Sequence, residues 1–131
     1  MKSLKIAGLA ALVALAGTTG ALAQAKGLDA IKARGTLLCG TSPGVPGFAQ
    51  PDDKGNWVGL DVDYCRALAV AIFNDPMKVT FKPLTSKERF TALQSGEVDL
   101  LSRTTTWTMS RDSSMGMSFA GVTLMTAKAS W

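Results

Sequence analysis

One stretch of the chain carries most of the side chains that could bind a small polar molecule. An apolar segment, Val98–Leu101, runs into a loop that contains Thr104, Thr105 and Thr106 and then Arg111. An arginine can bind both oxygens of a carboxylate, while neighbouring hydroxyls donate or accept beside it. In open α/β sheets, ligands bind outside the carboxyl ends of the strands. The pattern fits either a carboxylate-binding loop or, with no ligand implied, a polar surface loop with an exposed arginine.

The remaining composition argues against catalysis and against nucleic-acid binding. The 131 residues include no histidine, which is the commonest general base and metal ligand. The cations are scattered and form no basic stripe, so nucleic-acid binding has no support. Asp61 and Asp63 are best explained as acids that suit the N-terminus of a helix. We expect no enzymatic activity, no cofactor and no metal site.

The first residues have the form of an export signal. Lys2 and Lys5 give a basic start, Ile6–Ala16 is apolar, and Ala21–Ala23 has the small-x-small pattern that signal peptidase needs. The apolar run is too short for a permanent membrane anchor. We expect residues 1–23 to be removed after Ala23 and the product to be exported; the alternative is a buried or membrane-bound helix.

Two cysteines, Cys39 and Cys65, remain in the expected mature chain. An even pair in an oxidising compartment favours a disulfide over a catalytic thiol. The alternative is two buried free thiols, because cysteine is often a small core residue.

The hydrophobic pattern alternates between strands and helices, which implies a mostly parallel sheet with helices on its faces. A capping box at Thr85-Ser86-Lys87-Glu88 starts one of the helices, and Arg89 is expected on the solvated face of that helix. The expected helices are Gly27–Arg34, Leu60–Phe73 and 85–94, and the expected strands are Thr36–Gly40, Trp57–Val58, Lys78–Pro83 and Val98–Leu101. The residues 41–51, rich in glycine and proline, should form a loop.

Two features of the sequence resemble a known family. Gly59–Asp63, followed by Leu68, Ala69 and Ile72, resembles the signature of family 3 bacterial solute-binding proteins, the periplasmic receptors of polar amino-acid ABC transporters. The longer runs PGFAQPDDKGNWVGLDVDYCRA and PLTSKERFTALQSGEVDLLSRTTTWTMSRD are similar to the general L-amino-acid binding proteins within it.

The resemblance implies a fold and a function. Residues 24–123 would be part of the first lobe of a type II periplasmic-binding-protein fold, which binds its ligand in a cleft between two α/β lobes. The receptor would work in the periplasm, as a monomer when full length, capturing L-amino acids for an inner-membrane ABC permease. The alternatives are an enzyme on the same fold, such as a dehydratase or a peptidoglycan lyase, and a stand-alone exported interaction protein.

The resemblance also assigns roles to individual residues. Arg111 would hold the α-carboxylate of the ligand, and Thr106 would assist through its hydroxyl and amide. Thr104 would face the α-ammonium group. Arg103 and Ser42 lie at positions near the ligand and are further candidate contacts.

Members of this family are roughly twice this length or more. The residues 124–131 do not continue the family pattern, but a reading frame shifted by one nucleotide near Leu124 permits a continuation of the family type. We therefore expect residues 124–131 to be an out-of-frame tail and the chain to be a truncated, poorly functional fragment that lacks its second lobe.

Overall fold

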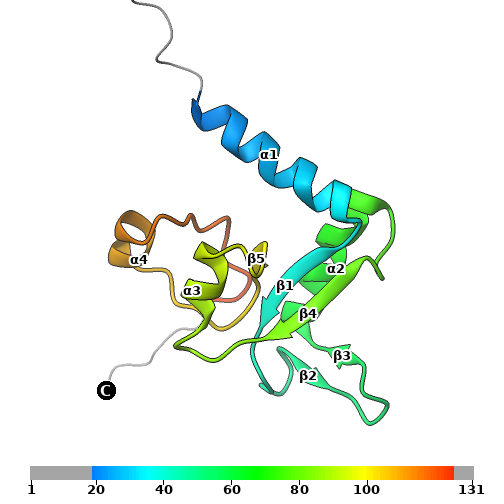
Figure 1. Cartoon of the computed structure of the whole chain (residues 1–131). Coiled ribbons are helices and arrows are strands. Elements are labelled where there is room, and N and C mark those ends of the chain that lie inside the picture. The colour runs from blue at the N-terminus through cyan, green and yellow to red at the C-terminus, as the bar shows by residue number, and fades with distance from the viewer. Residues whose placement is uncertain (1–18, 126–131) are drawn as a thin grey trace, which may run out of the picture.

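The computed structural model describes residues 19–125, with side chains described from Gly27 onward. It contains four helices and five short strands in this part of the chain (Figure 1). The helices are α1 (Thr19–Arg34), α2 (Leu60–Phe73), α3 (Arg89–Gln94) and α4 (Met109–Ser114). The strands are β1 (Leu37–Thr41), β2 (Gln50–Pro51), β3 (Trp57–Val58), β4 (Val79–Pro83) and β5 (Leu100–Leu101).

The main sheet has three parallel strands in the order β4-β1-β5. β1 is therefore central, and its register places Leu37 beside Val79 and Cys39 beside Leu100. Crossovers that contain a helix, α2 before β4 and α3 before β5, return the chain to the same sheet direction, as parallel pairing requires. The predicted α/β class with a parallel sheet is confirmed.

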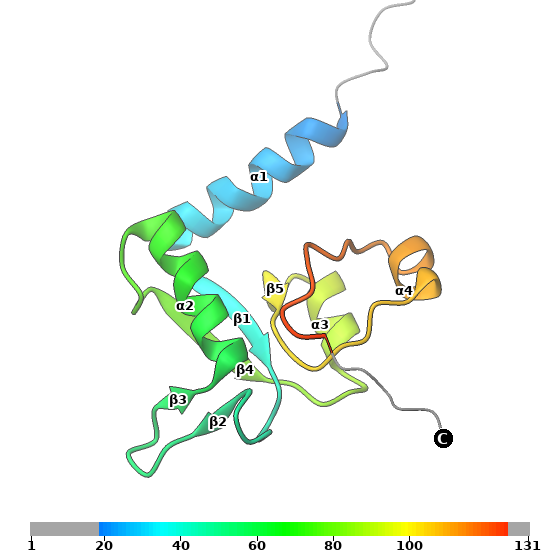
Figure 2. The same ribbon diagram turned by 180° about the vertical axis from the view of Figure 1, so that it is seen from behind.

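Helices cover both faces of this sheet. α2 lies behind the sheet in Figure 1 and in front of it in Figure 2. Its buried residues Val62, Cys65 and Ala69 recur at helical spacing, and Cys65 reaches β1 directly. On the other face, Leu84, Ala92 and Val98 form a core cluster. Gly40 of β1 is buried against Leu84 and Val98 of this cluster, where an added Cβ would have no room.

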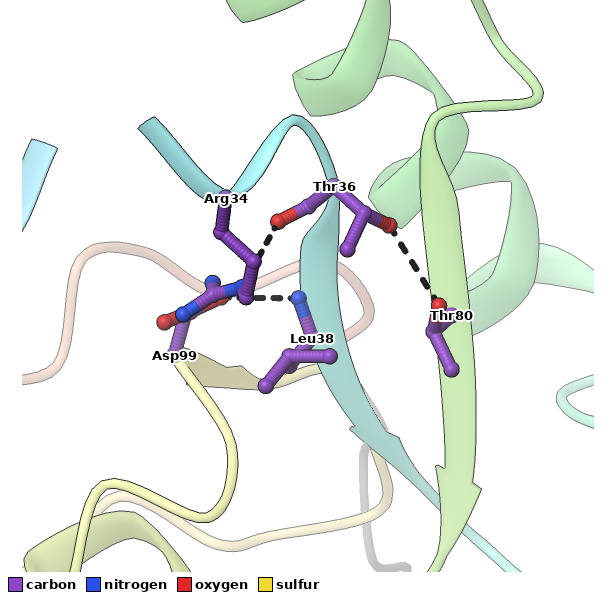
Figure 3. A network of polar contacts seen from close by, with 5 residues as sticks. All are labelled: Arg34, Thr36, Leu38, Thr80 and Asp99. Atoms are coloured by element: carbon purple, nitrogen blue, oxygen red, sulfur yellow. Dashed lines mark hydrogen bonds and ion pairs between the residues drawn. The ribbon is translucent and has the colours of Figure 1, made fainter. Parts of the chain in front are cut away.

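A polar network at the start of β1 joins the end of α1 to Asp99, the residue that directly precedes β5 (Figure 3). The Asp99 carboxylate accepts a hydrogen bond from the Leu38 backbone N–H at 2.7 Å and also pairs with Arg34. In return, the Asp99 N–H donates to the Leu38 carbonyl at 2.8 Å. The side chain of Asp99 thus replaces a backbone acceptor in the β1–β5 ladder, which shortens β5 to two residues instead of the four predicted.

Three further elements differ from the prediction. α1 begins at Thr19 instead of Gly27, because the preceding residues are rich in alanine and an internal glycine costs only about 1 kcal/mol. Residues 50–51, predicted as part of a loop, form β2 by pairing with β3. α4 was expected to be an irregular loop, but the Thr108 side chain accepts the Arg111 N–H at 3.3 Å and caps a short helix.

The predicted capping box is present, although the helix begins slightly later than expected. The Thr85 N–H donates to the Glu88 carboxylate at 3.0 Å, and the Glu88 N–H donates to the Thr85 hydroxyl at 3.4 Å.

The first 18 residues of the expected export signal and the residues 126–131 of the expected tail lie outside the described part of the chain. In residues 19–125, none of the helices combines the length and apolar character needed to cross a bilayer.

Candidate functional site

A cavity of about 840 Å³ lies beside the carboxyl end of β5. Its walls come from the N-terminal half of α2, from the loop that leaves β5, from α3 and from the returning segment 116–124. Trp107 and Phe119, whose rings are stacked with centroids 5.1 Å apart, hold that returning segment against the loop. A cavity of this volume is within the range that holds a small organic ligand.

The loop that leaves β5 brings several predicted residues to the cavity. Arg103, Thr104 and Thr106 all line it. The Arg103 guanidinium donates to the Leu84 carbonyl and, at 3.1 Å, to the Thr85 carbonyl, which fixes the side chain in place. Burial lowers the pKa of Arg103, but the group stays a cation because its ordinary value is so high.

Arg111 is anchored next to Thr106 by α4. Its Nη1 donates to the Thr106 carbonyl at 2.8 Å, and its guanidinium carbon lies 5.6 Å from the centroid of the Phe90 ring. This bond uses one of the five N–H donors that a guanidinium carries. Within residues 19–125, Arg111 is not among the residues that line the cavity, but it is hydrogen-bonded to Thr106, which does line it.

Ser42 occupies a different position. It follows β1 directly, is fully buried, and its Oγ has no hydrogen-bond partner in the described residues. It does not belong to the cavity lining that residues 19–125 provide. The structure therefore brings Thr104, Thr106 and Arg103 together at the cavity and keeps Arg111 next to Thr106, whereas Ser42 is buried directly after β1 and is not part of the lining.

Arg89 was interpreted from the sequence as part of a solvated helix face, and this interpretation is wrong. Arg89 is only 8 % exposed, and its Nη1 donates a hydrogen bond to the Thr104 carbonyl at 3.3 Å. Its guanidinium carbon lies 4.7 Å from the centroid of the Phe90 ring. Burial, together with the nearby positive charge of Arg111, lowers the pKa of Arg89. The available signal in the sequence was Phe90 next to Arg89, because an aromatic ring can pack against a guanidinium group.

The two acids at the start of α2 have separate environments. Asp63 is exposed and pairs with Arg66 at 3.4 Å, as a capping acid on a surface helix would. Asp61 is 2 % exposed and lines the cavity, and its Oδ2 has no partner in the described residues. Burial raises the pKa of Asp61, and the positive charge of Arg103 partly opposes that rise. Asp61 therefore lines the candidate site, although its position at the start of a helix indicated only a capping role.

Cys39 and Cys65 are joined by a disulfide bond with Cα atoms 6.4 Å apart. Both residues are fully buried, so the bond lies inside the core between β1 and α2. Its effect on the site is indirect, because it fixes the helix that carries Asp61 against the strand that precedes Ser42. In the part of the chain that the structure describes, no group of histidine, cysteine or acidic residues is arranged to hold a metal ion.

A curated relative of this chain is a periplasmic amino-acid-binding protein. The general L-amino acid-binding periplasmic protein AapJ of Rhizobium johnstonii is 55 % identical over 101 residues, covering 77 % of this chain and 30 % of AapJ. The chain spans about a third of the length of the curated relatives it matches.

Solved structures give the same assignment. A periplasmic binding protein from Brucella ovis, solved with glutathione bound, is 65 % identical with a TM-score of 0.71, covering 72 % of this chain and 30 % of that one. The arginine-bound form of domain 1 from TmArgBP is 31 % identical with a TM-score of 0.58, covering 64 % of this chain and 63 % of that one. The model of the bacterial extracellular solute-binding proteins, family 3, matches residues 37–131. The chain belongs to this family of solute-binding proteins.

Proposed function

We propose that this chain forms a ligand-binding lobe of a periplasmic receptor that captures L-amino acids for an ABC transporter. The observation that carries the proposal is the position of Arg111, which is bonded at 2.8 Å to the carbonyl of a threonine that lines the cavity. A planar cation beside a hydroxyl-rich loop supplies the donors that an α-carboxylate needs. The proposal includes no chemical step.

Each predicted residue has a role in this proposal. Arg111 holds the α-carboxylate with its remaining N–H groups, and Thr106 adds its hydroxyl and amide. Thr104, whose carbonyl already accepts from Arg89, faces the α-ammonium. Arg103 contacts the ligand from the cavity wall, and Ser42, which is buried directly after β1, is a further candidate contact.

The relatives support the ligand class. One is named for general L-amino acid binding, and a single domain of another has been solved with arginine bound. A ligand that contacts two lobes only in the closed state shifts the hinge equilibrium toward closure, which a permease can recognise. We further propose that the receptor is a monomer and that its export signal is removed after Ala23, which N-terminal sequencing of the exported protein would test by finding Gln24 first.

The test is a titration of the ¹⁵N-labelled chain with L-amino acids, followed by NMR. Binding should be weak, in the millimolar range, because one lobe covers only part of the ligand. The variant Arg111→Ala should lose binding of all amino acids, since a carboxylate without its bidentate partner costs about 2–5 kcal/mol. Arg111→Lys should recover little of it, because an ammonium cannot reproduce the fork.

The control is Lys54→Ala, which removes a positive charge from an exposed turn remote from the cavity lining. It should bind as the parent chain does. Normal affinity in the Arg111→Ala variant would show that Arg111 is not part of the site. Chemical-shift changes that cluster away from Thr104 and Thr106 would show that the ligand binds elsewhere.

A further inference from the structure

Two arginine side chains meet at one aromatic ring beside the candidate site. The guanidinium carbon of Arg89 lies 4.7 Å from the centroid of the Phe90 ring, and that of Arg111 lies 5.6 Å from the same centroid. Phe90 itself is half-buried and lines the cavity. A guanidinium group within about 6 Å of a ring centroid is attracted by the negative face of the ring. Both arginines are therefore close enough for a cation–π interaction with Phe90.

Neither of these guanidinium groups has a carboxylate partner among the described residues. The ion pairs found there are Arg34–Asp99, Arg66–Asp63 and Lys82–Glu97. Asp112 directly follows Arg111, but its carboxylate accepts the Phe119 backbone N–H at 3.4 Å instead. Burial and, after it, the positive charge of Arg111 lower the pKa of Arg89, so the two cations repel each other. The Phe90 ring is the group that attracts both of them.

The same two guanidinium groups also hold the threonine loop. Arg89 Nη1 donates a hydrogen bond to the Thr104 carbonyl at 3.3 Å, and Arg111 Nη1 donates one to the Thr106 carbonyl at 2.8 Å. An aromatic face attracts a cation without accepting its N–H groups in strong hydrogen bonds, whereas a carboxylate in the same place would occupy those donors and neutralise the charge. A ring can therefore hold Arg111 and still leave its remaining donors for a ligand.

We propose that Phe90 is a positioning residue for amino-acid binding: its ring holds the Arg111 guanidinium beside Thr106 before the ligand arrives. This proposal rests on the function proposed above, because only that function assigns Arg111 to the α-carboxylate. Without the ring, repulsion from Arg89 moves Arg111 away, and the side chain must be ordered again when the ligand binds. Ordering a side chain in advance improves affinity, because less conformational freedom is lost on binding.

The first experiment titrates the ¹⁵N-labelled chain and its variants with L-alanine, whose side chain adds no polar contact. Phe90→Leu keeps an apolar side chain but removes the ring. It should weaken the binding of L-alanine about fivefold, the factor for one cation–π contact. Phe90→Tyr keeps the ring and should bind L-alanine within about twofold of the parent chain, because tyrosine also attracts a guanidinium group.

The matched control is Phe81→Leu. Phe81 belongs to β4 and makes the same kind of contact, because the guanidinium carbon of Arg66 lies 5.7 Å from the centroid of its ring. Among the described residues, Phe81 is not part of the cavity lining. Phe81→Leu therefore removes a similar contact at a different place, and it should leave the affinity for L-alanine unchanged.

The second experiment measures the position of Arg111 by NMR without any ligand. A proton over the face of an aromatic ring gives a signal at lower chemical shift, because of the ring current. The Arg111 Nε–H signal of the parent chain should therefore move to higher chemical shift in Phe90→Leu and keep its position in Phe90→Tyr. In Phe81→Leu the same signal should not move.

The outcomes separate this proposal from the one on which it rests. If the parent chain binds no amino acid, the proposed function fails and the role of Phe90 in it fails too. If the parent chain binds and Phe90→Leu binds equally well, or Phe90→Tyr loses as much affinity as Phe90→Leu, only the role of Phe90 is refuted. An Arg111 signal that does not move in Phe90→Leu refutes it as well. If Phe90→Leu does not fold, Phe90→Met replaces it, with the same expected loss of about fivefold.

Discussion

The contact between Asp99 and Leu38 allows a sharp test of how this lobe is held together. Asp99→Ala removes the carboxylate that accepts the Leu38 N–H at 2.7 Å and that pairs with Arg34 (Figure 3). A hydrogen bond to a charged acceptor contributes about 1.5–3 kcal/mol, and leaving a partly buried N–H unpaired makes the loss hard to recover. The Arg34 side chain is 34 % exposed, so its ion pair adds only about 0.2–1 kcal/mol.

The expected loss in the free energy of unfolding is therefore about 2–4 kcal/mol. It would be measured by urea denaturation followed by tryptophan fluorescence and circular dichroism. Asp99→Asn should lose about half as much, because an amide oxygen can still accept from Leu38 while the charge is gone.

The control for this change is Glu97→Ala. Glu97 pairs with Lys82 at 3.3 Å on the surface, and the carboxylate is 51 % exposed. Its removal should cost less than about 1 kcal/mol. If Asp99→Ala and Glu97→Ala destabilise the chain equally, the Asp99 carboxylate is not part of the strand ladder and the reasoning fails.

Three further predictions concern other positions. Replacing both Cys39 and Cys65 with serine should lower the free energy of unfolding by about 2–4 kcal/mol, and titration of the oxidised, unfolded parent chain should find no free thiol; two thiols would contradict the bridge. Gly59→Ala should destabilise the chain by about 1–3 kcal/mol in thermal melts, because Gly59 has φ 123° and an added Cβ would lie 2.4 Å from a backbone oxygen. In the control Gly27→Ala, the added Cβ meets nothing within 4 Å, so this change should be neutral or stabilising. Because burial raises the pKa of Asp61, the parent chain should lose stability relative to Asp61→Asn as the pH rises from about 4 through that raised pKa; a pH-independent difference in urea midpoints would contradict this.

The sequence predicted the parts of the fold in which local pattern and tertiary structure agree. α2 and β3 have the predicted bounds, because the apolar spacing of the helix and the turn before the strand leave little choice. β5 was predicted too long, since no sequence pattern indicates that the Asp99 side chain takes the place of a backbone acceptor. α4 was missed because its stability depends on one threonine cap and not on an apolar stripe.

The candidate site shows the same division. The family pattern placed Arg103, Thr104 and Thr106 on one loop, and all three line the cavity, whereas Arg111 and Ser42 do not. Asp61 and Arg89 were assigned to capping and to a solvated face, because a charged residue at a helix start is usually exposed. Their burial depends on which segments pack over them, and those segments are distant in the sequence.

The central position of β1 determines the order in which this chain can fold. β1 is the first strand to leave the ribosome, but it pairs with no strand near it in sequence: its partners in β4 and β5 come about forty and about sixty residues later. Contacts of such long sequence separation form slowly, because the intervening loop must be closed first. A chain synthesised from its N-terminus therefore cannot complete the sheet until the β5 loop has emerged. The segment that carries Thr104, Thr106 and Arg111 directly follows β5, so it leaves the ribosome just as the sheet becomes able to close.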